Sequence, residues 1–211
     1  GKRQERTADA DEIEQRTVQL LSNSGNKTDT EGVLGMEWDP KNDTFGYNIK
    51  LNFSVKKRNM HLEPDLFPEQ VAAKIPQTLT KRQVLSQVNR VYDPMGLVSP
   101  FTVRAKMMLR KLWGHENKLD WDDSIPEHLK REWITFFEEL FELEKVRIPR
   151  CIKPTMSVEA PELVLFSDAS KEAYGAAAYV RWSLTDGTFA AQLIASKNRI
   201  APIKTADMVR L

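Results

Sequence analysis

The chain of 211 residues is long enough for one or two domains, and its 41% hydrophobic content suffices for a core. Its net charge of +1 neither indicates nor excludes a nucleic-acid partner. The single cysteine, Cys151, excludes an internal disulfide and a cysteine-rich zinc site. No apolar run approaches the roughly 20 residues that span a bilayer, and the polar start is unlike a signal peptide, so we expect no membrane partner.

The first part of the chain predicts a polar segment followed by a hairpin. Residues 1–32 mix charges with a Ser/Asn/Gly stretch, which predicts a mobile N-terminal segment. Two β-like runs follow at residues 33–38 and 44–53. The turn residues at 39–43 join them and predict a β-hairpin.

The middle of the chain predicts three amphipathic helices in a small bundle. Thr80 and Gln83 form a capping box that starts the first helix, and the run Asp93-Pro94-Met95-Gly96 breaks it. Ser99 as the cap and Pro100 as the first residue start the second helix. A third helix starts near Pro126, and its apolar face carries Leu129, Trp133, Phe136, Phe137, Leu140 and Phe141.

The last part predicts three strands, at residues 162–167, 174–182 and 189–196. The apolar run 163–166 indicates that the first strand is buried. Asp168 follows it and shares a strand face with Val164 and Phe166. A carboxylate on an apolar face requires a positive partner such as Mg²⁺. Alternatively, Asp168 is an ordinary turn residue that starts the next loop.

Positive charge is concentrated in the first two predicted helices, and the third is acidic. Between residues 81 and 113 a single acid, Asp93, accompanies seven cations: Lys81, Arg82, Arg90, Arg104, Lys106, Arg110 and Lys111. A basic helical face suits the sequence-independent binding of a phosphate backbone. The alternative is a solvated face that pairs with the acidic helix. The tryptophans are spread along the chain, which indicates core anchors rather than a base-stacking platform: Trp38, Trp113, Trp121, Trp133 and Trp182.

Several segments together resemble the polymerase polyprotein of BEL/Pao-type retrotransposons, the region sometimes called the Pao "peptidase". They are VLGMEWDP (33–40), LTKRQVLSQVNRVYDPMGLVSPFTVRAKMMLRKLW (79–113), LDWDDSIP (119–126), RIPR (147–150) and ELVLFSDASKEAYGAAAYV (162–180). The resemblance implies an α+β chain, in which residues 33–155 form a reverse transcriptase-derived hairpin and helical thumb or connection. Residues 156–211 would then be the first three strands of a truncated ribonuclease H-like mixed α/β domain.

The resemblance also implies a function. The chain would link reverse transcriptase to ribonuclease H in a cytoplasmic, nuclear or particle-borne polyprotein and bind a template–primer duplex or RNA/DNA hybrid. Asp168 would be a catalytic Mg²⁺ ligand. No polymerase Asp-Asp turn and no further matching ribonuclease H carboxylate is found, so we expect the isolated chain to be inactive. Asp43-Thr44 is followed by Phe45 and does not make an aspartic-protease loop. The alternative is a decayed or domesticated remnant that acts as a non-enzymatic nucleic-acid-binding or interaction module.

Overall fold

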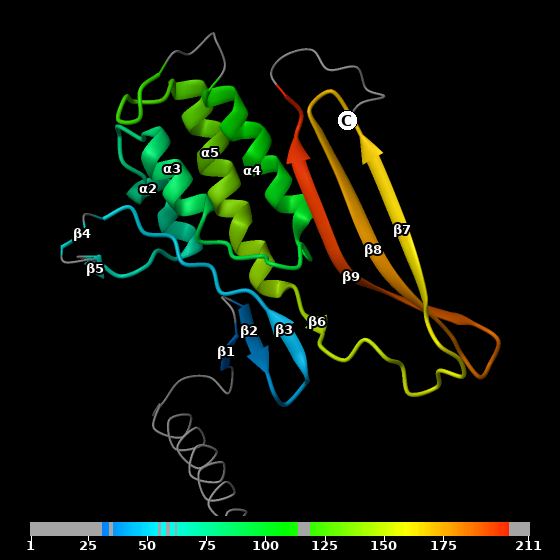
Figure 1. Cartoon of the computed structure of the whole chain (residues 1–211). Helices are drawn as coiled ribbons and strands as arrows, with labels where there is room; N and C mark the ends of the chain where they lie inside the picture. The colour runs from blue at the N-terminus through cyan, green and yellow to red at the C-terminus, as the bar shows by residue number, and fades with distance from the viewer. Residues whose placement is uncertain are drawn as a thin grey trace, which may run out of the picture.

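A computed structural model describes residues 31–202 of the chain, except 34–35, 55, 58–59, 62 and 114–118. Figure 1 shows a group of helices beside a long three-stranded sheet, with a smaller sheet below the helices. The predicted α+β class is therefore confirmed. The predicted mobile segment lies almost entirely outside the described residues.

The smaller sheet contains the predicted hairpin. Strands β2 (Met36–Asp39) and β3 (Thr44–Gly46) pair antiparallel. The turn between them includes Asp43 at φ 50°, a left-handed conformation that Asp adopts more readily than most residues. Two short strands complete the order β1-β2-β3-β6, namely β1 (Glu31–Val33) and β6 (Ile148–Pro149).

The second hairpin strand is shorter than the sequence predicts. It was expected to reach residue 53, but β3 ends at Gly46 and the chain continues as extended backbone that packs on the helices. Its amides bond to helical side chains instead of to a strand. The N–H of Ile49 donates to Glu144 Oε1 at 2.9 Å, and the N–H of Asn52 donates to Gln87 Oε1 at 2.9 Å.

The helices begin close to where the caps predict. Helix α3 (Lys81–Val88) has the predicted capping box, in which the amide of Gln83 donates to Thr80 Oγ1. Helix α4 (Ser99–Leu112) has Val98 as its N-cap, so the prediction that Ser99 is the cap is wrong. The carboxylate of Asp93 accepts from the N–H groups of Leu97 and Val98 at 2.8 and 3.0 Å. The amides of Phe101 and Thr102, which a Ser99 cap would serve, donate instead to the carbonyl of Val98 at 3.0 Å each.

The core lies between the helices and the extended segment. The third predicted helix is α5 (Glu127–Leu140), and its side chains Trp133 and Phe137 are 1% and 0% exposed. The Phe137 ring packs edge-on against Phe53 at 5.5 Å. None of the described helices has the length and hydropathy to cross a membrane. Short elements fill the remaining surface: β4 (Lys56–Lys57), β5 (Met60–His61), η1 (Pro68–Gln70), α2 (Val71–Lys74) and η2 (Phe141–Lys145).

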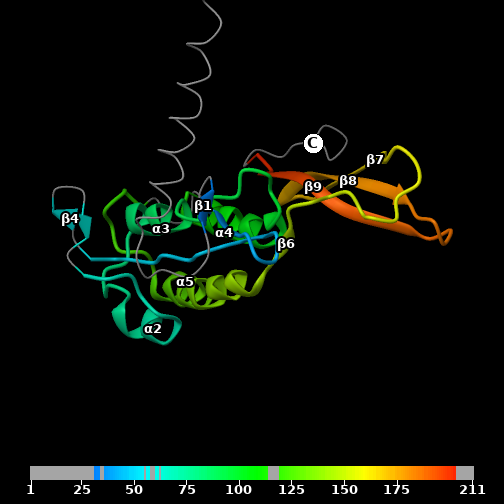
Figure 2. The ribbon, with the colours of Figure 1, turned by 90° about the horizontal axis from the view of Figure 1, so that it is seen from below.

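The larger sheet has the antiparallel order β7-β8-β9, with β7 (Glu162–Ala169), β8 (Ala173–Ser183) and β9 (Phe189–Ile200). The three predicted strands are confirmed, and each is longer than expected. Figures 1 and 2 show β9 beside α4 and β7 on the side of the sheet away from the helices.

The prediction that the first strand is buried is wrong. In β7, Leu163, Leu165 and Phe166 are 63%, 68% and 61% exposed. The helical bundle packs against β9, and no described element pairs with the outer edge of β7. The apolar residues of β7 are typical of a buried strand, but no element of the described residues covers this strand.

Candidate nucleic-acid interface at the helix–sheet seam

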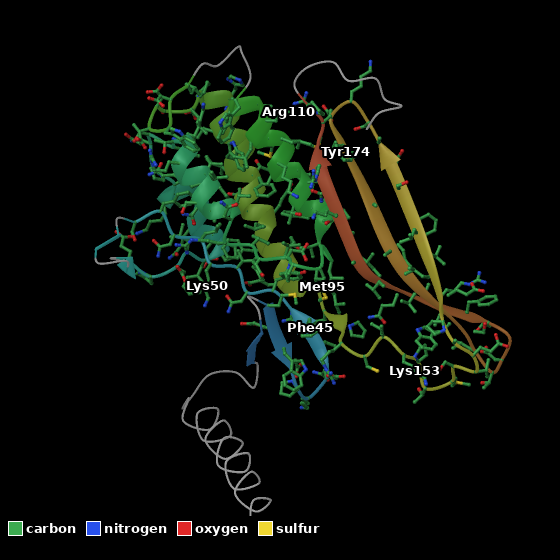
Figure 3. The ribbon with its side chains drawn as sticks, viewed as in Figure 1. Phe45, Lys50, Met95, Arg110, Lys153 and Tyr174 are labelled. Atoms are coloured by element: carbon green, nitrogen blue, oxygen red, sulfur yellow. The ribbon has the colours of Figure 1, made fainter. Side chains whose placement is uncertain are left out.

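The loop before α4 joins the helices to the sheet. The amide of Ser196 donates to the carbonyl of Met95 at 2.8 Å, and the Ser196 hydroxyl donates to the carbonyl of Gly96. Further along β9, Asn198 Nδ2 donates to the carbonyl of Ser99 at 3.1 Å. Met95 is labelled in Figure 3 at this junction. The outer edge of β9 is therefore occupied by the loop, and α4 runs alongside the strand; we call this junction the seam.

Two of the predicted basic residues lie in the seam and bond to uncharged groups. Lys106 Nζ lies 2.5 Å from Asn198 Oδ1. Arg110, labelled in Figure 3, donates to the carbonyl of Pro202 at 3.1 Å and to the carbonyls of Lys171 and Glu172 at 3.4 Å each. Since amide and carbonyl oxygens carry no net charge, these bonds orient the two cations without neutralising them.

The environment of Lys106 shows how the seam accumulates positive charge. Burial is the main cause that lowers the pKa of Lys106 below its ordinary value. Asp93 acts in the opposite direction, while the like charge of Lys197 lowers the pKa further. A nearby anion would favour the charged form of Lys106 and so oppose the effects of burial and of Lys197 on its pKa.

The other five predicted cations have different partners. Lys81 is buried and donates to the carbonyl of Leu119. Four make ion pairs with carboxylates: Arg82 with Asp122, Arg90 with Asp65, Arg104 with Glu139 and Lys111 with Glu132. The basic segment thus divides into cations paired with acids and cations held by neutral groups. Nucleic-acid binding by all seven stays a prediction.

Two cations of the seam were missed in the sequence. Lys197 and Arg199 are alternate residues of β9, so they project from the same face of the sheet, and both are exposed. Neither makes an ion pair with a carboxylate of the described part of the chain. The alternation Lys-Asn-Arg was a usable signal, but the predicted strand stopped at Ser196, one residue before it.

Asp168 lies near the end of β7. It pairs in register with Gly175, which pairs with Asn198, so the Asp168 side chain projects from the sheet face of Asn198, opposite to that of Lys197 and Arg199. The carboxylate is exposed, and its Oδ1 accepts from the N–H of Ala169 at 2.8 Å. A side chain at Gly175 would lie 3.2 Å from the carbonyl of Lys197, so the small residue keeps the strands closely packed here.

The described residues do not by themselves make a Mg²⁺ site. No group of three or more His, Cys, Asp or Glu side chains that could hold a metal occurs among them. Asp168 brings one carboxylate, whereas Mg²⁺ is bound octahedrally and needs several oxygen ligands. Asp168 as a metal ligand therefore stays a prediction for the complete parent protein, and no catalytic step follows from the described geometry.

The tryptophans are not all core anchors. Trp133 and Trp182 are buried, as expected, at 1% and 8% exposure. Trp113 and Trp121 are 41% and 42% exposed, so the prediction is wrong for these two. Their rings meet edge-on at 5.7 Å near the C-terminal end of α4.

A three-stranded antiparallel sheet with an exposed aspartate near the end of its first strand, joined at its last strand to a helical bundle, makes this an α+β protein. The sequence model of the Pao retrotransposon-like RNaseH-like domain matches residues 80–211. The chain belongs to this family, which confirms the resemblance to Pao-type polyproteins. No curated protein matches the chain. The family match includes helices α3 to α5 as well as the sheet. The predicted boundary near residue 155 stays a prediction.

Proposed function

We propose that this segment of a retroelement Pol polyprotein connects reverse transcriptase to ribonuclease H and binds a template–primer duplex or RNA/DNA hybrid at the seam. Membership of the Pao family supports the retroelement Pol assignment. The observation that supports binding is the group of seam cations, Lys106, Arg110, Lys197 and Arg199, which make no ion pair with a carboxylate of the described residues.

Phosphates are the chemical partner that this group favours. Each phosphate neutralised by Lys or Arg releases condensed counterions, so binding weakens as salt rises. Four such contacts to a duplex give a slope of log affinity against log salt of about −3 to −4. The net charge of +1 hides this local excess because acids elsewhere in the chain balance it.

We also propose that the remainder of the polyprotein covers β7. Leu163, Leu165 and Phe166 are exposed, with Leu165 and Phe166 on opposite faces because they are adjacent in the strand. Exposed apolar patches and unpaired strand edges mark surfaces that bind further protein. In such a longer protein, additional carboxylates would join Asp168 to hold Mg²⁺. With one carboxylate, the 211-residue chain is expected to bind the hybrid without cleaving it.

The test is the binding of a fluorescent RNA/DNA hybrid followed by anisotropy at about 50 and 200 mM salt. The double variant Lys197→Gln, Arg199→Gln should weaken binding about tenfold or more at low salt and reduce the salt slope by about 2. The matched control is Lys41→Gln, Lys50→Gln. It removes the same charge from exposed side chains that lie away from the seam. Lys50 is labelled in Figure 3. Equal losses in the two double variants would contradict a seam-specific site, and absence of wild-type binding at about 50 mM salt would reject hybrid binding altogether.

A second candidate is the non-enzymatic remnant. The ion pairs of Arg104 with Glu139 and Lys111 with Glu132 favour it, because they satisfy helical cations inside the molecule. Such a remnant would be a non-enzymatic nucleic-acid-binding or interaction module, and these internal ion pairs favour the interaction module. Failure of the wild-type chain to bind the hybrid, together with intact folding, would favour this alternative.

A further inference from the structure

A groove lies between the C-terminal half of α4 and the end of β9, next to the seam cations. Six of its lining residues combine charge, apolar surface and an exposed indole: Lys106, Leu109, Arg110, Trp113, Arg199 and Ile200. Its volume of about 650 Å³ is in the range of small-ligand sites. No carboxylate is among its lining residues.

We propose that this groove binds an unpaired nucleotide of a single-stranded tail that continues from the bound duplex. The inference rests on the proposed function in that the seam supplies the phosphate contacts. It adds a second mode of recognition, stacking of a base on Trp113, that a fully paired duplex does not offer.

The exposed indole carries the first part of the argument. Trp113 is 41% exposed although it is a large aromatic side chain, and it follows directly after α4. Its position is fixed by contacts with two neighbours. The Trp121 ring meets it edge-on at 5.7 Å, and Lys81 Nζ lies 5.1 Å from the ring centre. A partly exposed ring that is already held in place is suited to stacking, because binding a base then costs little side-chain conformational entropy.

The charge around the groove carries the second part. Arg110 and Lys106 are held by carbonyl and amide oxygens, with no carboxylate of the described residues paired to them, and Arg199 is exposed. Three cationic side chains and no carboxylate line this groove, so an anionic ligand is favoured over a neutral one. The apolar side chains Leu109 and Ile200 line the same space, which favours a ligand with both a planar apolar part and an anionic part. A nucleotide has both.

The direction of α4 indicates how the two parts would be arranged. A helix C-terminus carries partial negative charge, so a phosphate is disfavoured directly at the end of α4, where Trp113 lies. The uncharged base fits there, and the phosphate fits on the side of Arg199 and Arg110. On the Trp121 side, Arg82 lies 5.7 Å from the ring centre and is paired with Asp122. Of the two exposed tryptophans, Trp113 lines the groove and Trp121 does not, so Trp113 is the stacking residue.

The experiment compares three labelled ligands by anisotropy: a blunt RNA/DNA hybrid, the same hybrid with an unpaired tail of about six nucleotides, and the free single strand. Wild-type protein should bind the tailed hybrid about tenfold more tightly than the blunt one. Trp113→Ala should lose this preference and keep its affinity for the blunt hybrid, while Trp113→Phe should retain part of the preference. Phe67→Ala is the matched control, since it removes an exposed aromatic side chain that does not line the groove, whereas Trp121 contacts Trp113 directly.

The outcomes separate this inference from the proposed function. Equal wild-type binding of blunt and tailed hybrids, or equal effects of the two alanine variants, would overturn the stacking site and leave hybrid binding in place. If the wild type binds neither hybrid, the proposed function fails, and the free single strand decides: binding that depends on Trp113 supports the groove, and no binding overturns it. Equal, Trp113-dependent binding of a poly-glutamate peptide would also overturn it, because the groove would then recognise anions in general.

Discussion

Gly96 and Ser196 are one hundred residues apart in sequence and in direct contact in the structure, where the Ser196 hydroxyl donates to the Gly96 carbonyl. Gly96 has φ +71°, and an added Cβ would collide with the backbone carbonyl of Ser196. Only glycine combines that backbone conformation with so close an approach. This contact attaches the loop before α4 to β9 and so positions the seam.

The first prediction concerns this contact. Gly96→Ala should lower the free energy of unfolding by more than about 2 kcal/mol, because strain at positive φ adds to the collision with β9. Gly187→Ala is the matched control: its φ is +79°, but nothing lies within 4 Å of the added Cβ. It should lose about 1 kcal/mol, the cost of the conformation alone. Urea denaturation of both variants measures the difference, and similar losses would show that the contact with Ser196 is unimportant.

The second prediction contrasts two large aromatic side chains. Trp133→Ala should lower the free energy of unfolding by about 3–5 kcal/mol, because the indole is 1% exposed and its removal leaves a cavity. Phe166→Ala should change it by no more than about 0.5 kcal/mol, since Phe166 is 61% exposed. Thermal and urea unfolding measure both. A large loss for Phe166→Ala would mean that β7 is covered in solution, for example by self-association, which sedimentation would detect.

The helices could be predicted from sequence because their determinants are local. The capping box of Thr80 and Gln83 lies within four residues, and the spacing of Trp133, Phe136 and Phe137 marks one face of α5. The α+β class and the three long strands followed from similar patterns and from the family resemblance.

The seam could not be predicted because its contacts join distant segments. β9 continues to Ile200, and the loop at Met95 and Gly96 bonds to its outer edge. No periodicity near residue 196 shows that such a partner exists, and Lys197 and Arg199 were missed because the predicted strand stopped at Ser196. The burial of β7 was predicted wrongly for a similar reason. An apolar run indicates that a strand can be buried, but it does not show which other segment covers the strand.

The third prediction concerns pH. The hydrogen bond from the Arg150 guanidinium is the main cause that holds the pKa of Asp43 below its ordinary value, with a further contribution from the Trp38 indole. A depressed pKa in the folded state means that the charged form stabilises the fold. This contribution is present above about pH 4, the ordinary pKa of Asp, and is lost as the pH falls through the lower folded-state pKa.

Asp43→Asn should therefore be less stable than wild type at neutral pH, and the difference should shrink as the medium becomes strongly acidic. Asn is a fair control of shape because it also adopts positive φ readily, and Asp43 has φ 50°. Urea midpoints of the two proteins between about pH 2 and pH 7 measure the effect. A difference that is constant with pH would show that the Arg150 pair does not stabilise this turn.

The last prediction concerns Asp168. Asp168→Asn should leave the free energy of unfolding of this chain within about 0.5 kcal/mol of wild type, because the side chain is exposed and an amide oxygen can still accept from the Ala169 N–H. Hybrid binding should persist, since the Asp168 side chain projects from the sheet face opposite to Lys197 and Arg199.

In a longer polyprotein that cleaves RNA in hybrids, the same substitution should abolish cleavage, because an amide is a much poorer Mg²⁺ ligand than a carboxylate. The turn-former interpretation predicts the opposite, as Asn is equally suited to turns. Hybrid-cleavage rates of the two extended proteins at equal Mg²⁺, with hybrid affinities measured in parallel, distinguish the two interpretations. An unchanged rate for the Asn variant would remove Asp168 from the proposed metal site and leave it as an exposed strand residue just before the β7–β8 turn at Ser170.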